Sequence, residues 1–158
     1  MTAVGMGIFL STLDASIVNI ALPSLEKALD TNFATITWVT QAYLLAVTTL
    51  LLGIGRLSDI VGKRVLYLSG FIIFAIGSVL CGLAWNVGAL ISFRIVQAIG
   101  AALLMAIGPA IITETFPPEE RGKALGIVGS IVSIGIIAGP TLGGIILRFL
   151  SWHWIFLI

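Results

Sequence analysis

The feature that most constrains this chain is a series of apolar runs, each long enough to cross a lipid bilayer. A hydrocarbon core about 30 Å thick takes roughly 20 apolar residues in a helix. Five runs reach that length: about residues 3–22, 35–57, 65–85, 87–113 and 123–147. A sixth begins at Trp154 and stops at Ile158, so we expect the natural protein to continue beyond this chain.

The composition of the chain agrees with a place in lipid. Hydrophobic residues make up 59% of the 158 residues, charged residues only 9%, and the mean hydropathy is +1.18. These values lie outside the range of soluble domains. With a formal net charge of +1 and no basic run, the chain offers nucleic acid no binding surface. We therefore predict an all-α, polytopic membrane helix bundle in one domain over residues 1–158, surrounded by the lipid bilayer.

The first apolar run differs from a cleaved signal peptide in three ways. No Lys or Arg precedes it, and it is longer than the usual hydrophobic region of about 7 to 15 residues. Asp14 also interrupts it. We therefore interpret this run as a membrane span.

Basic residues outside the runs predict the orientation of the chain. Five of them follow the second and fourth runs: Arg56, Lys63, Arg64, Arg121 and Lys123. Two follow the first and fifth runs: Lys27 and Arg148. The positive-inside rule then places the even connectors and the amino terminus in the cytoplasm. Four tryptophans fall at the opposite, outer interface, as an aromatic belt requires: Trp38, Trp85, Trp152 and Trp154. The prediction is a multi-pass protein of the cell membrane.

Two opposite charges lie inside the apolar runs at nearly the same depth. Asp14 is eight residues from the outer end of the first run, and Arg94 is seven from the outer end of the fourth. At about 1.5 Å per residue, they lie roughly 12 and 10.5 Å below one surface. An unpaired charge there costs about 2.5 to 3.5 kcal/mol on insertion scales. The two side chains can meet if the first and fourth helices are neighbours.

Three interpretations of this pair remain open. Asp14 and Arg94 can form a structural clamp, or Arg94 can extend outward to the headgroups. We favour a third, in which Asp14 takes up and releases a proton as its surroundings change, because intramembrane carboxylates usually belong to ion or substrate paths. Gln97 and Ser11 share the helix faces of this pair and could line one wet cavity with it. Asn19 projects to the side and is equally suited to bonding a neighbouring helix.

The fifth run carries a stripe of small residues. Its glycines recur at steps of four: Gly135, Gly139 and Gly143. Gly144 lies beside the last of them, and Gly126 and Gly129 extend the small surface, so another backbone can approach closely. Pro140 has no amide hydrogen, which leaves the carbonyl of Ile136 without its helical donor and predicts a bend.

The connector after the second run reads GRLSDIVGKR, residues 55–64, with charges of both signs in ten residues. Gly62 allows a positive φ there, so we predict a tight turn. The connector after the fourth run reads FPPEERGKALG, residues 116–126. Its two prolines suit a helix start, and Glu119 and Glu120 fall near the positive end of that helix.

These segments together resemble motifs of the major facilitator superfamily. GRLSDIVGKR resembles its loop motif between spans two and three, and FRIVQAIGAA, with Arg94, Gln97 and Gly100, resembles its span-four motif. The glycine stripe with Pro140 resembles its span-five motif of antiporters. LDASIVNIALP looks like the span-one signature of drug:proton antiporters with fourteen predicted spans, and WHWIFLI resembles the start of span six. Two positions depart from the motifs: Ile60 and His153 stand where arginine is usual.

The resemblance implies a proton-driven exporter of drug-like or amphipathic small molecules that works by alternating access. This chain would be a partial amino-terminal half, and its partners would be protons, the substrate and a carboxy-terminal half. Asp14 would be the protonated, substrate-facing carboxylate, Arg94 its coupling partner, and Gly139 and Pro140 would shape span five. The loop motif would form a cytoplasmic gate: Gly55, Arg56, Asp59, Gly62, Lys63 and Arg64.

Two other functions are alternatives to export. A facilitator that imports a sugar or an organic anion would share the scaffold, and a truncated, non-transporting interaction protein is a second alternative. An intramembrane hydrolase has little support, because the runs contain one carboxylate and no histidine. We expect no cofactor and no metal site. The single cysteine, Cys81, is expected only to pack.

Overall fold

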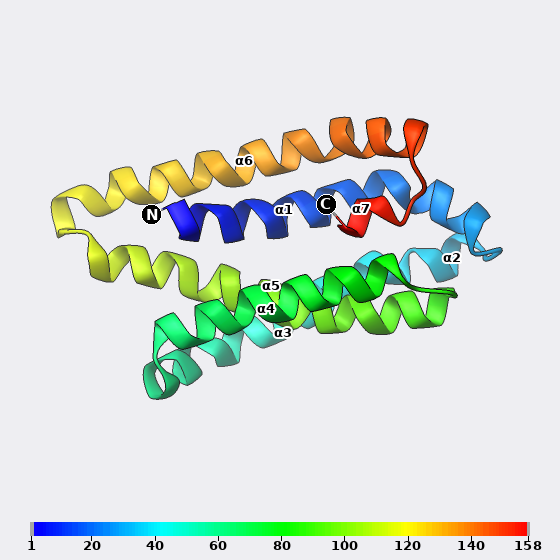
Figure 1. The fold of residues 1–158 in the computed structure, drawn as a ribbon. Helices are drawn as coiled ribbons and strands as arrows, with labels where there is room; N and C mark the ends of the chain where they lie inside the picture. The colour runs from blue at the N-terminus through cyan, green and yellow to red at the C-terminus, as the bar shows by residue number, and fades with distance from the viewer. Residues whose placement is uncertain (1, 158) are drawn as a thin grey trace.

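The computed structural model describes residues 2–157, and Met1 and Ile158, where the sixth apolar run stops, lie outside them. This part of the chain is helical and contains no strand (Figure 1). Its helices are α1 (Thr2–Ala28), α2 (Phe33–Ile36), α3 (Trp38–Val61), α4 (Lys63–Gly82), α5 (Val87–Thr115), α6 (Pro118–Phe149) and α7 (Trp154–Leu157). Five segments within residues 2–157 are long and apolar enough to cross a membrane, α2 and α3 counting as one. The predicted all-α membrane bundle is confirmed.

Most helices extend beyond the apolar runs that predicted them. Helix α1 continues to Ala28, well past the end of its run at residue 22, and α6 begins at Pro118 rather than near residue 123. Polar residues continue a helix where the backbone stays hydrogen-bonded, so the length of a run and the length of a helix differ. Side-chain caps fix two of the starts: Asn32 accepts from the amide of Thr35 at 2.8 Å, and Asn86 caps α5 in the same way.

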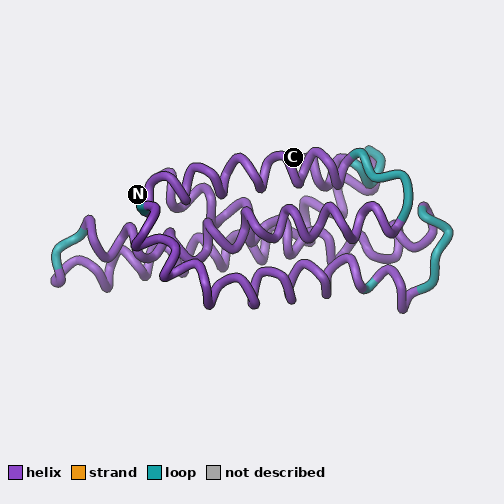
Figure 2. The backbone as a smooth tube through the Cα atoms, turned by 90° about the horizontal axis from the view of Figure 1, so that it is seen from below, coloured by secondary structure: helices purple, strands orange, loops and turns teal. Residues whose placement is uncertain are grey.

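The long helices lie side by side, with α5 in contact with α1, α3 and α4 (Figures 1 and 2). Helix α6 packs mainly against α1. Helix α5 is correspondingly apolar on all sides and buries residues from Leu90 to Ile112. Helices α1 and α5, which carry Asp14 and Arg94, are therefore neighbours.

Glycines bring α4 and α5 unusually close together. A Cβ atom at Gly77 would lie 2.5 Å from the Cα atom of Gln97, and one at Gly100 would lie 2.7 Å from the carbonyl oxygen of Gly70. Contacts this short leave no room for a side chain, so the two backbones touch directly. This crossing determines which α4 side chains reach the buried polar residues of α5.

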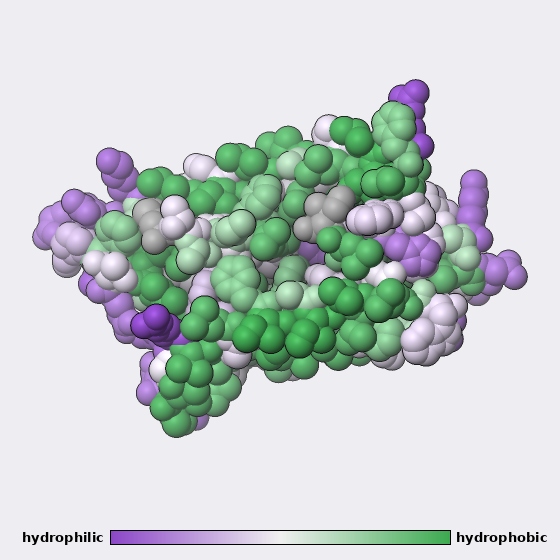
Figure 3. Space-filling view, in the orientation of Figure 1, coloured by the Kyte–Doolittle hydropathy of each residue, from purple (hydrophilic) through white to green (hydrophobic). Residues whose placement is uncertain are grey.

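The turn between α3 and α4 is a single residue, Gly62, with φ of 97°. The predicted tight turn with a positive φ is confirmed. On the face that Figure 3 shows, the middle of the bundle is mainly hydrophobic, and most hydrophilic residues lie toward its left and right ends. The four tryptophans lie at the end where α1 and α4 finish and α3 and α5 start (Figure 1).

Candidate functional site

The centre of the bundle contains a buried ion pair between α1 and α5. The Nη1 atom of Arg94 donates to Oδ2 of Asp14 at 2.6 Å. The side chain of Arg94 is 0% exposed and that of Asp14 is 9% exposed. The two side chains therefore meet, as they can when the first and fourth long helices are neighbours. The alternative in which Arg94 extends outward to the headgroups is wrong, because its guanidinium points into the protein.

Gln97 completes the pairing of the carboxylate. It lies one helical turn beyond Arg94 on α5, and its Nε2 atom donates to Oδ1 of Asp14 at 3.0 Å. Its Oε1 atom accepts from Nη1 of Arg94 at 2.6 Å. Both oxygens of Asp14 thus accept hydrogen bonds from α5.

Helix α3 supports the guanidinium from another side. The Cζ atom of Arg94 lies 4.1 Å from the ring centroid of Tyr43, a cation–π contact, and its Nε atom donates to the carbonyl of Val39 at 3.5 Å. The ring of Phe156, on α7, lies 5.7 Å away. Among the described residues, Nη2 of Arg94 and the hydroxyls of Thr40 and Tyr43 are buried without a hydrogen-bond partner. The site therefore retains unused polar capacity toward α3.

Two residues of α4 that were not predicted as site residues also join this network. The Oγ atom of Ser78 accepts from Nε2 of Gln97 at 2.7 Å, and the thiol of Cys81 donates to Oε1 of Gln97 at 3.7 Å. The expectation that Cys81 only packs is wrong. A usable signal existed in the third run, since Ser78 and Cys81 are three residues apart on one helix face and follow Gly77.

Ser11 and Asn19 do not join the network around Asp14. Ser11 is buried, but its hydroxyl donates to the carbonyl of Ile8 in its own helix at 2.9 Å. Asn19 lies on an exposed part of α1, away from the buried face that carries Asp14. Neither residue is positioned to exchange a hydrogen bond with the carboxylate in this conformation.

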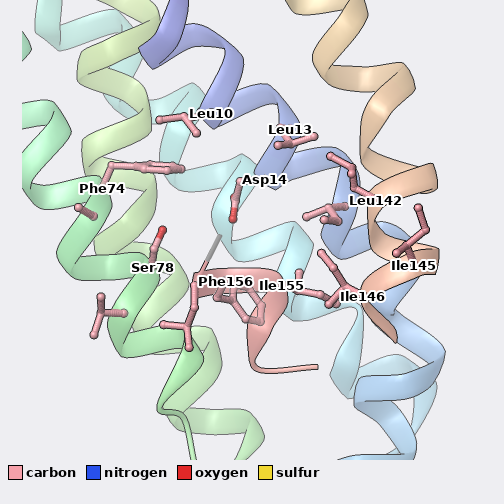
Figure 4. Close-up of a pocket in the computed structure, with 14 residues that line it drawn as sticks. Leu10, Leu13, Asp14, Phe74, Ser78, Leu142, Ile145, Ile146, Ile155 and Phe156 are labelled. Carbon is pink, nitrogen blue, oxygen red and sulfur yellow. The ribbon is translucent and has the colours of Figure 1, made fainter. Parts of the chain in front are cut away.

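Asp14 borders a pocket of about 310 Å³ between α1, α4, α6 and α7 (Figure 4). Its lining is otherwise apolar, apart from Ser78 on the facing helix. The predicted wet cavity shared by Ser11, Gln97 and Asp14 is therefore not what surrounds the carboxylate here. Leu157, the last described residue of α7, also lines this pocket.

The glycine stripe of α6 packs directly against α1. A Cβ atom at Gly139 would lie 2.5 Å from Oγ of Ser16, and one at Gly135 would overlap the side chain of Thr12. Gly143 faces α1 in the same way, so the predicted close approach is confirmed. A Cβ atom at Gly144, Gly126 or Gly129 would meet nothing within 4 Å. Gly126 and Gly129 extend the small surface, but within residues 2–157 no other helix packs against it at these two positions.

Pro140 has an additional consequence for the contact between α1 and α6. It supplies no amide hydrogen to the carbonyl of Ile136, and α6 nevertheless continues as one helix through this position. The hydroxyl of Ser16, on α1, donates to that carbonyl at 2.8 Å. The backbone group freed by proline is thus satisfied by a side chain of the neighbouring helix.

The loop-motif residues lie at the end of the bundle that contains the α3–α4 turn. Within residues 2–157 the ion pairs are Asp14 with Arg94 and Lys63 with Glu114, which joins the start of α4 to the end of α5. Arg56, Asp59 and Arg64 are exposed, as are the glycines of the motif, Gly55 and Gly62. The pairing of Lys63 with Glu114 was not predicted from the sequence.

The fold and the site define a class of protein: a polytopic helical membrane protein with a carboxylate and a guanidinium paired inside its spans. The chain belongs to the Major Facilitator Superfamily, whose family model matches residues 4–158. This family consists of membrane transporters, not enzymes.

Individual relatives agree with this membership. The chain is 50% identical over 153 residues to the riboflavin transporter RibZ of Clostridioides difficile strain 630. This alignment covers 97% of the chain and 34% of the relative. It is 41% identical over 153 residues to multidrug resistance protein 3 of Bacillus subtilis strain 168, covering 97% of this chain and 30% of that protein. The chain thus spans about a third of the length of these relatives.

A solved structure shares the fold. The crystal structure of a bacterial homolog of the human lysosomal transporter Spinster, in an inward-facing and occupied conformation, matches with a TM-score of 0.79. The match covers 99% of this chain and 39% of that protein, at 20% sequence identity. At this identity the match supports the fold alone.

Proposed function

We propose that the protein exports drug-like or amphipathic small molecules in exchange for protons. The observation that carries this proposal is the buried carboxylate of Asp14, whose charge is balanced by Arg94 inside the membrane-spanning helices. A carboxylate in this setting is costly unless it is paired, and it is a usual element of proton paths in transporters. Relatives named as multidrug resistance proteins support the same substrate class.

In the proposed cycle, Asp14 exchanges a proton and thereby changes its attraction to Arg94. When Asp14 is ionised, the pair holds α1 against α5 through two charge-assisted hydrogen bonds, to Arg94 and Gln97. When Asp14 is neutral, the electrostatic part of this attraction is lost. The two states differ in how tightly α1 is held, and alternating access requires such a difference. The stripe Gly135, Gly139 and Gly143 keeps α1 and α6 in contact meanwhile.

We further propose that the end of the bundle with the loop motif faces the cytoplasm and serves as a gate. The basic residues of the connectors and the tryptophans at the opposite end support this orientation. Arg56, Asp59 and Arg64 are exposed there and are available to a second half of the transporter. Lys63 is already engaged with Glu114, so it would stabilise the gate from within.

The surroundings of Asp14 favour an amphipathic substrate over a sugar or an organic anion. The pocket beside the carboxylate offers only one other polar side chain, Ser78, which cannot satisfy the many hydroxyls of a sugar. An anion would meet the like charge of Asp14. Riboflavin transport is a second candidate function, favoured by the 50% identity to a relative named as a riboflavin transporter. Riboflavin joins an aromatic ring system to a polyol chain and is itself amphipathic.

Proton-linked efflux of a fluorescent cationic dye, measured in inverted vesicles that carry the natural gene product, tests the proposal. Asp14→Asn keeps the size of the side chain and one of its two acceptor oxygens but cannot ionise. We expect this variant to lose pH-dependent efflux. Asp30→Asn, in the exposed turn after α1, is the matched control for removing one carboxylate. Unchanged coupling in Asp14→Asn would refute the assignment, and riboflavin uptake in the same vesicles separates the second candidate from the first.

A further inference from the structure

The amide of Gln97 is held on both of its sides. Its Oε1 atom accepts from Arg94 at 2.6 Å and from the thiol of Cys81 at 3.7 Å. Its Nε2 atom donates one hydrogen to Asp14 at 3.0 Å and the other to Ser78 at 2.7 Å. All four polar positions of the amide are therefore occupied, which fixes the direction in which its NH₂ group points.

The position of Ser78 follows from the close crossing of α4 and α5. Gly77 precedes it, and a Cβ atom at Gly77 would lie 2.5 Å from the Cα of Gln97 and 2.7 Å from its Cβ. The α4 backbone therefore rests on Gln97 itself. This contact places the hydroxyl of Ser78 within 2.7 Å of the amide nitrogen, on the side of the pocket that faces Asp14 (Figure 4).

A proton that binds Asp14 competes with the hydrogen bonds of its oxygens. Oδ2 accepts from Arg94 and Oδ1 accepts from Gln97, so a new O–H group at Oδ1 would face the NH₂ of Gln97, donor against donor. A proton at Oδ1 and the hydrogen bond from Gln97 therefore exclude each other along that direction. The other titratable groups near Asp14 are Arg94 on α5, Tyr43 on α3 and Cys81 on α4, and the pocket residues of α6 and α7 are apolar.

We propose that Ser78 is a positioning residue for proton exchange at Asp14, acting through the amide of Gln97, with Cys81 as a weaker second support. By accepting the second hydrogen of Nε2, Ser78 aims the first at Oδ1 of Asp14. This inference rests on the proposed function in one respect, that Asp14 exchanges a proton during transport. It adds that residues of α4, which do not touch the carboxylate themselves, set the pH at which the exchange occurs.

Infrared titration of the natural gene product in lipid tests the inference directly. The carboxylic C=O band of Asp14, identified by its loss in Asp14→Asn, reports protonation without any transport assay. Ser78→Ala removes the acceptor that aims the amide of Gln97. We therefore expect Asp14 to bind its proton more readily, so that the midpoint of the C=O band titration moves to higher pH. Interhelical hydrogen bonds in membranes average about 0.6 kcal/mol, which corresponds to a shift of about 0.5 pH unit, or about threefold in proton affinity. Cys81→Ala moves it in the same direction by less, because a thiol is a weak donor.

Two further variants separate positioning from a general loss of structure. Ser69→Ala is the matched control, because Ser69 also lies on α4 but bonds only to the carbonyl of Leu66 in its own helix. It should leave the midpoint unchanged. Ser78→Thr retains the hydroxyl, its extra methyl group can enter the pocket, and we expect it to restore the original midpoint.

An Asp14 band that titrates at the same pH in the original protein and in Ser78→Ala overturns the inference, as does an equal shift in Ser69→Ala. A midpoint that moves in Ser78→Ala while dye efflux shows no dependence on pH would support the positioning role and refute the proposed function. The two ideas can therefore fail separately.

Discussion

The contact between α1 and α6 leads to a specific prediction about Ser16 and Pro140. Because Pro140 cannot donate to Ile136, the hydroxyl of Ser16 is the donor that this carbonyl has, at 2.8 Å. Ser16→Ala therefore leaves a backbone oxygen of the membrane-spanning helix α6 without this partner. Interhelical hydrogen bonds in membrane proteins contribute on average about 0.6 kcal/mol and at most about 1.7 kcal/mol. We expect Ser16→Ala to lower the free energy of unfolding by an amount in this range.

Pro140→Ala provides the decisive second variant. Alanine at position 140 restores an amide hydrogen that can donate to Ile136 within α6, so the carbonyl no longer depends on Ser16. In that background, Ser16→Ala should cost close to nothing. The double-mutant cycle then gives a coupling energy of about 0.6 kcal/mol or more between Ser16 and Pro140, mediated by a backbone oxygen.

Reversible unfolding of the natural gene product in mixed micelles measures the four free energies of the cycle. Ser133→Ala serves as a control on α6, because that hydroxyl bonds to the carbonyl of Gly129 in its own helix and is exposed. It should show no coupling to position 140. If Ser16→Ala costs the same with proline and with alanine at position 140, the carbonyl is not the group that links the two residues, and the reasoning is refuted.

Three further predictions follow from contacts and backbone geometry. Arg94→Met should destabilise the protein by about 3 to 5 kcal/mol, as expected for a buried charge that loses its partner, and Asp14→Asn in addition should recover part of this loss in the same unfolding assay. Gly135→Val should reduce both the amount of folded protein in the membrane and its melting temperature, whereas Gly126→Val, on the open face of α6, should change neither. Gly62→Ala should cost about 1 to 3 kcal/mol, because φ of 97° is strained for a residue with a side chain, and an unchanged unfolding midpoint would contradict this.

Much of the fold followed from the sequence because a bilayer imposes one length on every span. The apolar runs placed the long helices, and counting residues from one surface placed Asp14 and Arg94 at matching depths. Gln97 also followed, since residues three apart share a helix face. These inferences need only the geometry of a single helix and the thickness of the membrane.

The remaining contacts of the site depend on how the helices cross. A single sequence contains no pattern from which these crossings can be predicted. Ser78 and Cys81 reach Gln97 only because α4 and α5 touch at Gly77. Gly126 and Gly129 extend the small surface of α6, yet a Cβ atom at either position would contact no other helix. A glycine permits a close contact without specifying a partner, so the partner had to be observed.

The single-residue connection between α3 and α4 has a mechanical consequence. Gly62 is the only residue between the two helices, so the connection is too short for α3 and α4 to move independently at this end. A tilt of α3 would therefore move α4 as well. Helix α4 in turn contacts the backbone of Gln97 at Gly77. Movement of the α3–α4 turn would in this way reach Gln97 and the ion pair that it contacts.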